Sequence, residues 1–296
     1  MLARRRLLGL GVGLLLLLVL AAPAGAAGGV IYGVCGDSVC RVKAETRVKR
    51  VLLRGDSSRP YAAVSADRSG RRLAFIRGEA VFRARAGGRS RQRIGTALRQ
   101  AAPEVHVRPD GGAVAWIDVL QRPDLISGGV YHERNLLTLS RAAAPGAERI
   151  VATDMLSAGW LGSSLMRQAF GEAGAPWFAC TVTAEAGCVR SVAVDGSRYL
   201  DQPAGSADGR RVAAVALPST PAGEESGVSG PIALFDAATG RRLRDLTAGK
   251  DSSPAFSPDG RTIAFVRGRG LYTVPVRGGR ARRLARGVES PSWAQR

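Results

Sequence analysis

The chain has 296 residues, of which 45% are hydrophobic and 5% aromatic, and its formal net charge is +19. This length suits one large domain, so no separate hydrolase domain is expected. Beyond the first 26 residues no apolar run approaches the length of a membrane span, which excludes a protein with several spans.

Residues 1–26 are predicted to be a signal peptide. Arg4 to Arg6 are basic, residues 7–20 are almost all apolar, and residues 24–26 form a small-residue cleavage site. The Arg-Arg-x-Leu-Leu order permits the twin-arginine route as well as the Sec route. The alternative is an uncleaved anchor, because the apolar run approaches the roughly 18 residues that span a bilayer. We expect an exported protein in the extracellular or periplasm-like envelope space, with no stable membrane span after cleavage.

The domain that follows, residues 27–296, begins in the middle of a repeat. Residues 34–55 align without a gap on residues 266–287, which predict the last strands of a four-stranded unit. The matching first strand is missing at this end of the chain. Residues 290–294 predict a first strand that no further strand follows, so we expect it to pair with the N-terminal strands.

The clearest copy of the repeat is residues 254–284, which predict three strands and the start of a fourth. In its turn, Pro258 presets φ, Asp259 caps the backbone and Gly260 takes a positive φ. Four short antiparallel strands in about 40 residues have the size of one β-propeller blade. Further copies are residues 34–55, 70–94, 107–116 and 203–215. The repeats predict an all-β, six-bladed β-propeller of four-stranded antiparallel blades, closed by pairing of the C-terminal strand with the N-terminal blade.

The register of the repeats also places the blade starts. They are expected at Pro60, Pro103, about Ala158, Pro203, Pro254 and Pro291. Residues 160–174 lack the turn motif and could hold a short helix, so the blade there is inferred by filling a gap.

Two insertions, residues 119–133 and 217–231, interrupt blades between the second and third strands. Such loops would emerge on one face, and loops on a rigid scaffold are the usual place for recognition. Tolerated surface insertions are the alternative. The predicted contact residues are Arg122, Asp124, Tyr131, His132, Glu133, Glu224 and Glu225.

Four cysteines in an exported chain predict disulfide bonds, and four cysteines allow three pairings. In the repeat alignment Cys35 and Cys40 flank a hairpin between second and third strands, and Cys180 and Cys188 flank a similar one. Two local bonds, Cys35–Cys40 and Cys180–Cys188, are therefore expected. The spacings match neither CxxC nor a zinc pattern, so no metal site is assigned.

The turn Ser257-Pro258-Asp259-Gly260, followed by an apolar strand, resembles the repeats of the TolB propeller family. Looser copies are Ser206-Ala207-Asp208-Gly209 and Arg108-Pro109-Asp110-Gly111. The resemblance covers nearly all of residues 27–296 and implies the fold, because propellers carry many unrelated activities. The separate N-terminal domain of TolB has no counterpart here, so its role in envelope translocation is not carried over.

Repeated acids and two histidines are the candidates for chemistry. The acids are expected to cap turns at separated positions, too far apart to share one ion; they are Asp67, Asp110, Asp208 and Asp259. His106 is expected in a first strand near the central channel as a structural residue. The sequence contains no nucleophile elbow, HExxH or P-loop motif, so no catalytic residue or cofactor is assigned. The enzyme alternative is a channel-centred lyase or hydrolase that uses His106 or His132.

Basic residues gather at the predicted fourth strands, on the outside of the ring. They are Arg47, Lys49, Arg50, Arg89, Arg91, Arg93, Arg241, Arg242, Arg244, Arg280, Arg282 and Arg283. Charged outer strands discourage edge-to-edge aggregation. The alternative is a basic belt that binds an anionic envelope polymer or membrane surface. Nucleic acid is not expected, because the chain is exported and no aromatic residues are interleaved for stacking.

The sequence thus predicts a monomeric, exported, non-enzymatic propeller that binds an envelope or extracellular protein, or a ligand, on a rigid scaffold.

Overall fold

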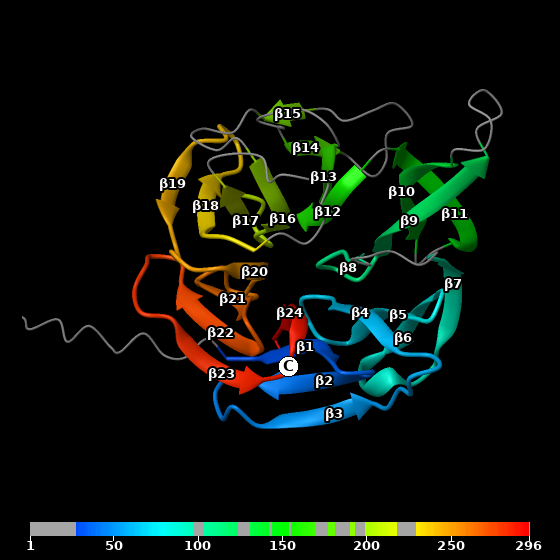
Figure 1. The fold of residues 1–296 in the computed structure, drawn as a ribbon, viewed down its shortest axis with the longest axis horizontal. Helices are drawn as coiled ribbons and strands as arrows, with labels where there is room; N and C mark the ends of the chain where they lie inside the picture. The colour runs from blue at the N-terminus through cyan, green and yellow to red at the C-terminus, as the bar shows by residue number, and fades with distance from the viewer. Residues whose placement is uncertain are drawn as a thin grey trace, which may run out of the picture.

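The computed structural model describes residues 28–97, 104–123, 131–141, 144–153, 155–169, 177–180, 190–192, 199–217 and 229–295. These residues form an all-β protein of antiparallel four-stranded sheets arranged around a centre (Figure 1). The predicted β-propeller fold is confirmed. A single 3₁₀ turn, η1 (Ala86–Gly88), is the one helical element in these ranges, and none of their helices is long and apolar enough to cross a membrane.

Within the described ranges the strands form six sheets, each with one strand near the centre and one at the rim. From the inside outward they are β24 (Glu289–Ala294), β1 (Val30–Cys35), β2 (Ser38–Lys43) and β3 (Lys49–Leu53); β4 (Tyr61–Ala66), β5 (Arg72–Arg77), β6 (Ala80–Arg85) and β7 (Gln92–Thr96); β8 (Val105–Val107), β9 (Ala113–Pro123), β10 (Tyr131–Arg141) and β11 (Ala144–Thr153); β12 (Met155–Leu161), β13 (Ser164–Ala169), β14 (Trp177–Cys180) and β15 (Arg190–Val192); β16 (Tyr199–Gly205), β17 (Arg211–Leu217), β18 (Ile232–Asp236) and β19 (Arg242–Asp245); β20 (Asp251–Phe256), β21 (Thr262–Arg267), β22 (Gly270–Pro275) and β23 (Arg282–Arg286).

The two ends of the sequence meet in one sheet, as the sequence predicts. β24 pairs antiparallel with β1, with Trp293 opposite Ile31 and Ser292 opposite Tyr32. Gly33 makes this approach possible, because a Cβ on it would lie 2.7 Å from the carbonyl oxygen of Glu289. The inner strands contact one another in cyclic order, from β24 through β4, β8, β12, β16 and β20 back to β24.

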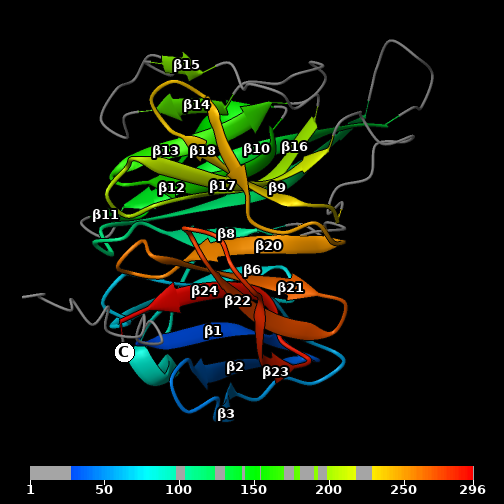
Figure 2. The same cartoon turned by 90° about the vertical axis from the view of Figure 1, so that its left-hand side faces the viewer.

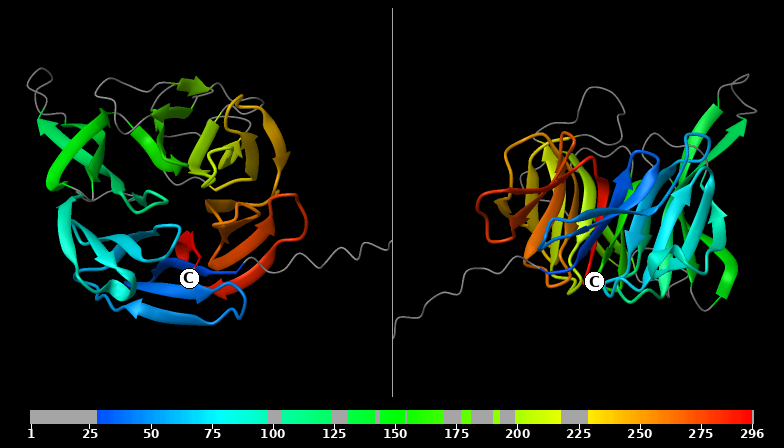
Figure 3. Two further views of the ribbon diagram at one scale, coloured as in Figure 1. Left: turned by 180° about the vertical axis from the view of Figure 1, so that it is seen from behind. Right: turned by 90° about the horizontal axis from the view of Figure 1, so that it is seen from below.

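The hydrophobic core lies between neighbouring sheets, which stack face to face, as Figures 2 and 3 show. On one side of β21, Phe265 packs toward the sheet β16–β19. On the other side Ala264 packs with Leu271, Ile31 and Trp293, between the last sheet and the first. A strand covered on both faces must be apolar at successive positions. This explains the unbroken apolar runs in β17 and β21, whose interior residues are all buried.

Polar side chains close the turns between first and second strands. The Ser257 hydroxyl accepts from the backbone N–H of Thr262 at 2.9 Å and donates to Asp259 at 2.6 Å, and Asp259 accepts from the N–H of Arg261 at 3.0 Å. Ser206 and Asp208 repeat these contacts. The predicted role of these acids as turn caps is confirmed here.

Asp67 caps the corresponding turn of its own sheet through a different arrangement. It accepts from the N–H of Arg72 at 3.1 Å and from the hydroxyl of Ser69 at 2.8 Å, so Asp67 replaces the turn serine and Ser69 replaces the aspartate. Asp67 therefore caps the same turn as Asp208 and Asp259, as expected, but from a position two residues earlier in the turn. Only the pattern of donors and acceptors is common to the turns, because either side chain can supply an oxygen to the backbone.

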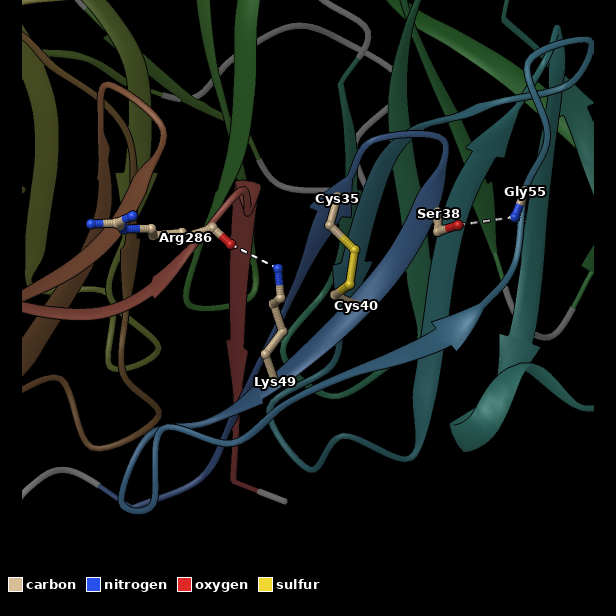
Figure 4. The surroundings of a disulfide bond; sticks show 6 residues. All are labelled: Cys35, Ser38, Cys40, Lys49, Gly55 and Arg286. Atoms are coloured by element: carbon tan, nitrogen blue, oxygen red, sulfur yellow. Dashed lines mark hydrogen bonds between the residues drawn. A yellow bond between two sulfur atoms is a disulfide. The ribbon is translucent and has the colours of Figure 1, made fainter.

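The disulfide bond Cys35–Cys40 is present across the β1–β2 hairpin (Figure 4). On the same sheet the Lys49 ammonium donates to the carbonyl oxygen of Arg286 at 2.8 Å, linking β3 to the end of β23. Cys180 ends β14, the third strand of its sheet, so the connection that follows runs from third to fourth strand. The expectation that Cys180 and Cys188 flank a second-to-third hairpin is therefore wrong, and Cys188 lies outside the described residues.

Two further expectations about local structure need correction. Residues 160–169 belong to the strands β12 and β13, joined by a turn at Gly162, and not to a short helix. The insertion 119–133 is strand in its described parts, because β9 and β10 continue to pair as far as Pro123 and Tyr131. Long paired strands satisfy their backbone groups in the ladder, as a loop would not.

Candidate functional site

A cavity of about 220 Å³ lies where the six inner strands meet, and all six contribute to its lining. Small residues from most of the inner strands contribute to its wall and let the strands approach the centre closely. Among them are Ala63, Ala158, Gly159, Ala204, Ala255 and Ser292. The frequent alanines and glycines of the sequence therefore have a structural use at this site.

Side-chain hydroxyls fasten neighbouring inner strands to one another around the cavity. Ser292 of β24 accepts from the N–H of Ala66 in β4 at 2.9 Å. Ser65 of β4 accepts in turn from the N–H of Val107 in β8 at 3.0 Å. Because these contacts join different sheets, they hold the lining strands at fixed separations and make the cavity a preformed site.

Glu104 forms the most connected polar group at the cavity. Its carboxylate accepts from the Ser157 hydroxyl at 3.0 and 3.1 Å and from the Ala158 N–H at 3.1 Å, and it lies 3.2 Å from His106 Nε2. The Trp160 indole also donates to the carbonyl oxygen of His106 at 3.1 Å. These contacts join the segment around β8 to β12 and fix the His106 ring, so His106 lies near the centre as the sequence predicts.

Three inner strands carry a strained backbone where they line the cavity. Gln202, Ser253 and Ser290 have left-handed φ values of 51°, 51° and 47°. In the described residues only two other non-glycine residues, Arg47 and Ser90, have a positive φ. Such conformations cost of order 1–3 kcal/mol each and persist where the surrounding structure imposes them, often at functional sites.

Each of these three residues precedes a proline and lies at a β-bulge. Pairing slips between Asp201 and Ala204 in β16 and between Ser252 and Ala255 in β20, and β24 slips where it pairs with Tyr32 and Val34. A bulge redirects side chains and is common beside binding sites. Gln202 uses this freedom: its side-chain oxygen accepts from the N–H of Ser253, joining β16 to β20.

The residues predicted from the insertions are placed only in part. Arg122 lies in β9 and pairs through its backbone with His132 of β10, whose neighbours Tyr131 and Glu133 pair along the same ladder. The other three, Asp124, Glu224 and Glu225, lie outside the described residues. The β9–β10 hairpin reaches beyond the neighbouring sheets in Figure 1.

Sequence reasoning singled out one lining residue, His106, and missed the others. Gln202, Ser253 and Ser290 each stand before a proline, a position that favours extended backbone, so the sequence does not predict their left-handed conformation. No local pattern marks Glu104, because its partners Ser157 and Ala158 come from the next sheet.

Comparison with known proteins supports the fold. No protein-family model matches the sequence, and no curated protein matches it by sequence. The structure is similar to TolB from Acinetobacter baumannii, with a TM-score of 0.64 and 16% identity over 92% of this chain and 67% of that one. It is also similar to a protein described as TolB from Agrobacterium tumefaciens, with a TM-score of 0.57 and 16% identity over 88% of this chain and 91% of that one.

A third similar structure is the tricorn protease, with a TM-score of 0.55 and 12% identity over 86% of this chain but 29% of that one. The chain thus corresponds to under a third of that protein's length. At these identities the likeness concerns the fold.

Proposed function

We propose that this chain, which has the fold of a TolB-like β-propeller, is an exported binding scaffold that receives a segment of a partner protein at its central cavity. The observation that carries the proposal is the cavity itself, which all six inner strands line and which cross-strand hydrogen bonds hold open. A preformed site binds without a large ordering cost.

The size of the cavity favours a protein segment over a metabolite. At about 220 Å³ it is smaller than the roughly 300–1,000 Å³ of typical small-molecule pockets. It has room for one or two side chains of a peptide whose remainder lies across the rim. The hydroxyl groups of the half-buried Ser253 and Ser290 on the bulged strands would bind that peptide.

The scaffold is proposed to be a closed, six-bladed ring. The six described sheets, the cyclic contacts of their inner strands and the pairing of β24 with β1 support this arrangement. Closure completes the first sheet with β24 and places each sheet between two neighbours, so the cavity walls are stiff. The ring is proposed to act as a monomer in the envelope or outside the cell, after removal of residues 1–26.

The predicted insertion residues are proposed as an outer part of the same recognition surface. Arg122, Tyr131, His132 and Glu133 share the β9–β10 hairpin, which continues outward from the sheet that contains His106. Asp124, Glu224 and Glu225 remain predictions from the sequence.

The proposal assigns no reaction to the chain. The Glu104 carboxylate is occupied by donors from Ser157 and Ala158, so its contact with His106 supports the wall of the cavity. A structural role for this pair is consistent with a binding protein.

The test uses two arginines of one turn. Arg68 lines the cavity, and Arg71, three residues later, is exposed and lies outside the lining. A photocrosslinking amino acid is placed at either position, and the protein is irradiated with its own envelope fraction. We expect a discrete crosslinked partner from position 68 and none from position 71. Equal crosslinking from both positions, or none from 68, contradicts a partner at the cavity.

A further inference from the structure

A second concave site lies on the outer side of the molecule, away from the central cavity. It is a groove of about 970 Å³ between the sheet that ends in β19 and the sheet β20–β23. The sheet that ends in β19 contributes Arg211, Arg241 and Arg244. The sheet β20–β23 contributes Arg261, Arg277, Arg280 and Arg282. Figure 2 turns this side of the molecule, with β22 and β23, toward the viewer. We call this surface the arginine groove.

The seven arginines of the arginine groove are all exposed, and none forms an ion pair with a described carboxylate. The one acid in the lining, Asp259, accepts hydrogen bonds from Ser257 and from the N–H of Arg261 within its own turn. The lining thus carries seven positive charges and one negative charge. Like charges that line one groove repel one another, which is unfavourable unless an anion binds among them.

Other basic residues on the outer strands are used differently. On β7 and the turn before it, Arg91 donates to the carbonyl oxygen of Gly88 at 2.8 Å and Arg93 to the hydroxyl of Thr96 at 2.9 Å, while Arg83 of β6 donates to Gln92 at 2.9 Å. These side chains are tied to their own sheet. The arginine groove is thus a local feature, distinct from a general basic coat on the rim.

The walls of the arginine groove are held together by the same residues. A guanidinium nitrogen of Arg244, in β19, donates to the carbonyl oxygen of Arg277, which follows β22. The loop after β22 is further fixed by a hydrogen bond from the N–H of Gly278 to the carbonyl oxygen of Pro275 at 2.9 Å. Threonines and apolar side chains form the floor, among them Thr262, Thr273 and Leu243. Positive charge therefore surrounds the ligand space from two sheets.

We propose that the arginine groove binds a linear phosphorylated polymer. Guanidinium groups converge on it from two different sheets, and a tetrahedral phosphate can accept from several such donors at once. A planar carboxylate would instead pair mainly with the two parallel N–H donors of a single arginine. A concave groove also fits a chain of phosphates better than a flat bilayer, which would meet a convex basic surface more fully. This site is separate from the central cavity, so this proposal can be tested independently of the proposed partner protein.

The test measures binding of fluorescently labelled inorganic polyphosphate to the purified full chain. The triple variant Arg241→Gln, Arg280→Gln, Arg282→Gln removes three charges from the groove. The control Arg83→Gln, Arg91→Gln, Arg93→Gln removes three charges elsewhere on the rim. We expect the groove variant to lose about tenfold or more in affinity, and its salt dependence to fall by about two in slope, while the control changes about twofold or less.

Equal losses in the two triple variants would overturn the proposal in favour of nonspecific attraction. Poly-glutamate bound as tightly as polyphosphate would overturn the choice of phosphate. Stronger binding to phosphatidylglycerol vesicles than to polyphosphate, abolished in the groove variant, would assign the surface to a membrane instead. As a check without substitutions, polyphosphate should protect Arg241, Arg280 and Arg282 from phenylglyoxal more than Arg83; uniform protection contradicts the groove.

Discussion

At the scale of single residues, the turns between first and second strands depend on oxygen atoms at two positions and tolerate several ways of supplying them. Ser257 with Asp259 is one solution and Asp67 with Ser69 is its reverse. In the third sheet Arg108 stands where the others have serine or aspartate, and its guanidinium donates to Asp110 at 2.7 Å. The charge of the acid matters most in that turn.

The turn at Asp110 predicts a dependence of stability on pH. The hydrogen bond from Arg108 lowers the pKa of Asp110 below its ordinary value of 3.8, and burial offsets part of that effect. A carboxyl whose pKa is lowered by folding stabilises the protein above the unfolded pKa, and this contribution is lost as the pH falls through the folded pKa. We expect urea midpoints to decline as the pH falls below about 4, and to decline less in Asp110→Asn.

Arg108→Gln is the matched variant, because it keeps the carboxyl and removes the main cause of the lowered pKa. It should weaken the acid dependence in the same way. If both variants keep the full decline of the unaltered chain, Asp110 is not the source.

At the scale of elements, three of the inner strands are distinguished by a left-handed residue at a bulge. The strands β16, β20 and β24 each contain a non-glycine residue with a positive φ directly before a proline. L-residues disfavour a positive φ, and a residue before proline favours extended backbone. Cross-strand contacts hold them there, such as the one between Gln202 and Ser253. The strain lies at the cavity, where a recognition surface needs redirected backbone groups.

Ser253→Gly tests this strain. Glycine adopts a positive φ without the cost of about 1–2 kcal/mol that an L-residue bears, but it loses about 0.5–1 kcal/mol in backbone entropy. We expect the free energy of unfolding to rise by up to about 1 kcal/mol, measured by chemical denaturation. Ser252→Gly, at the preceding position of the same strand, is the control and should lower it. A loss of stability in Ser253→Gly equal to that of the control would argue that Ser253 is not strained.

At the scale of the whole molecule, the arrangement depends on a contact between residues that are far apart in the sequence. Trp293 of β24 is buried against Ile31 of β1 and the neighbouring last sheet. The first and last sheets therefore stabilise one another through β24, and we expect them to unfold together.

Trp293→Ala should lower the free energy of unfolding by about 3–5 kcal/mol, as for other buried aromatic residues. It should also speed amide hydrogen exchange in β1 more than in β5 or β17, because β1 loses its inner neighbour. Phe235→Ala, a buried truncation in another sheet, is the control and should not single out β1. Unchanged relative exchange of β1 in Trp293→Ala would mean that β24 does not secure the first sheet.

The sequence by itself determined the repeating strands, their turns, the disulfide Cys35–Cys40 and the meeting of the two ends. These features follow from local residue spacing and from the repeat, because each copy has the same alternation of apolar strands and turn residues. It misplaced Cys180, because a shifted strand leaves no mark on composition.

Only the tertiary structure decided which residues face one another across sheets. The cavity lined by Glu104, Gln202, Ser253 and Ser290, and the arginine groove, both join side chains from different sheets. Contacts between sheets depend on the rotation from one sheet to the next around the centre. A single sequence encodes that rotation in the packing of its whole core and not in any one segment.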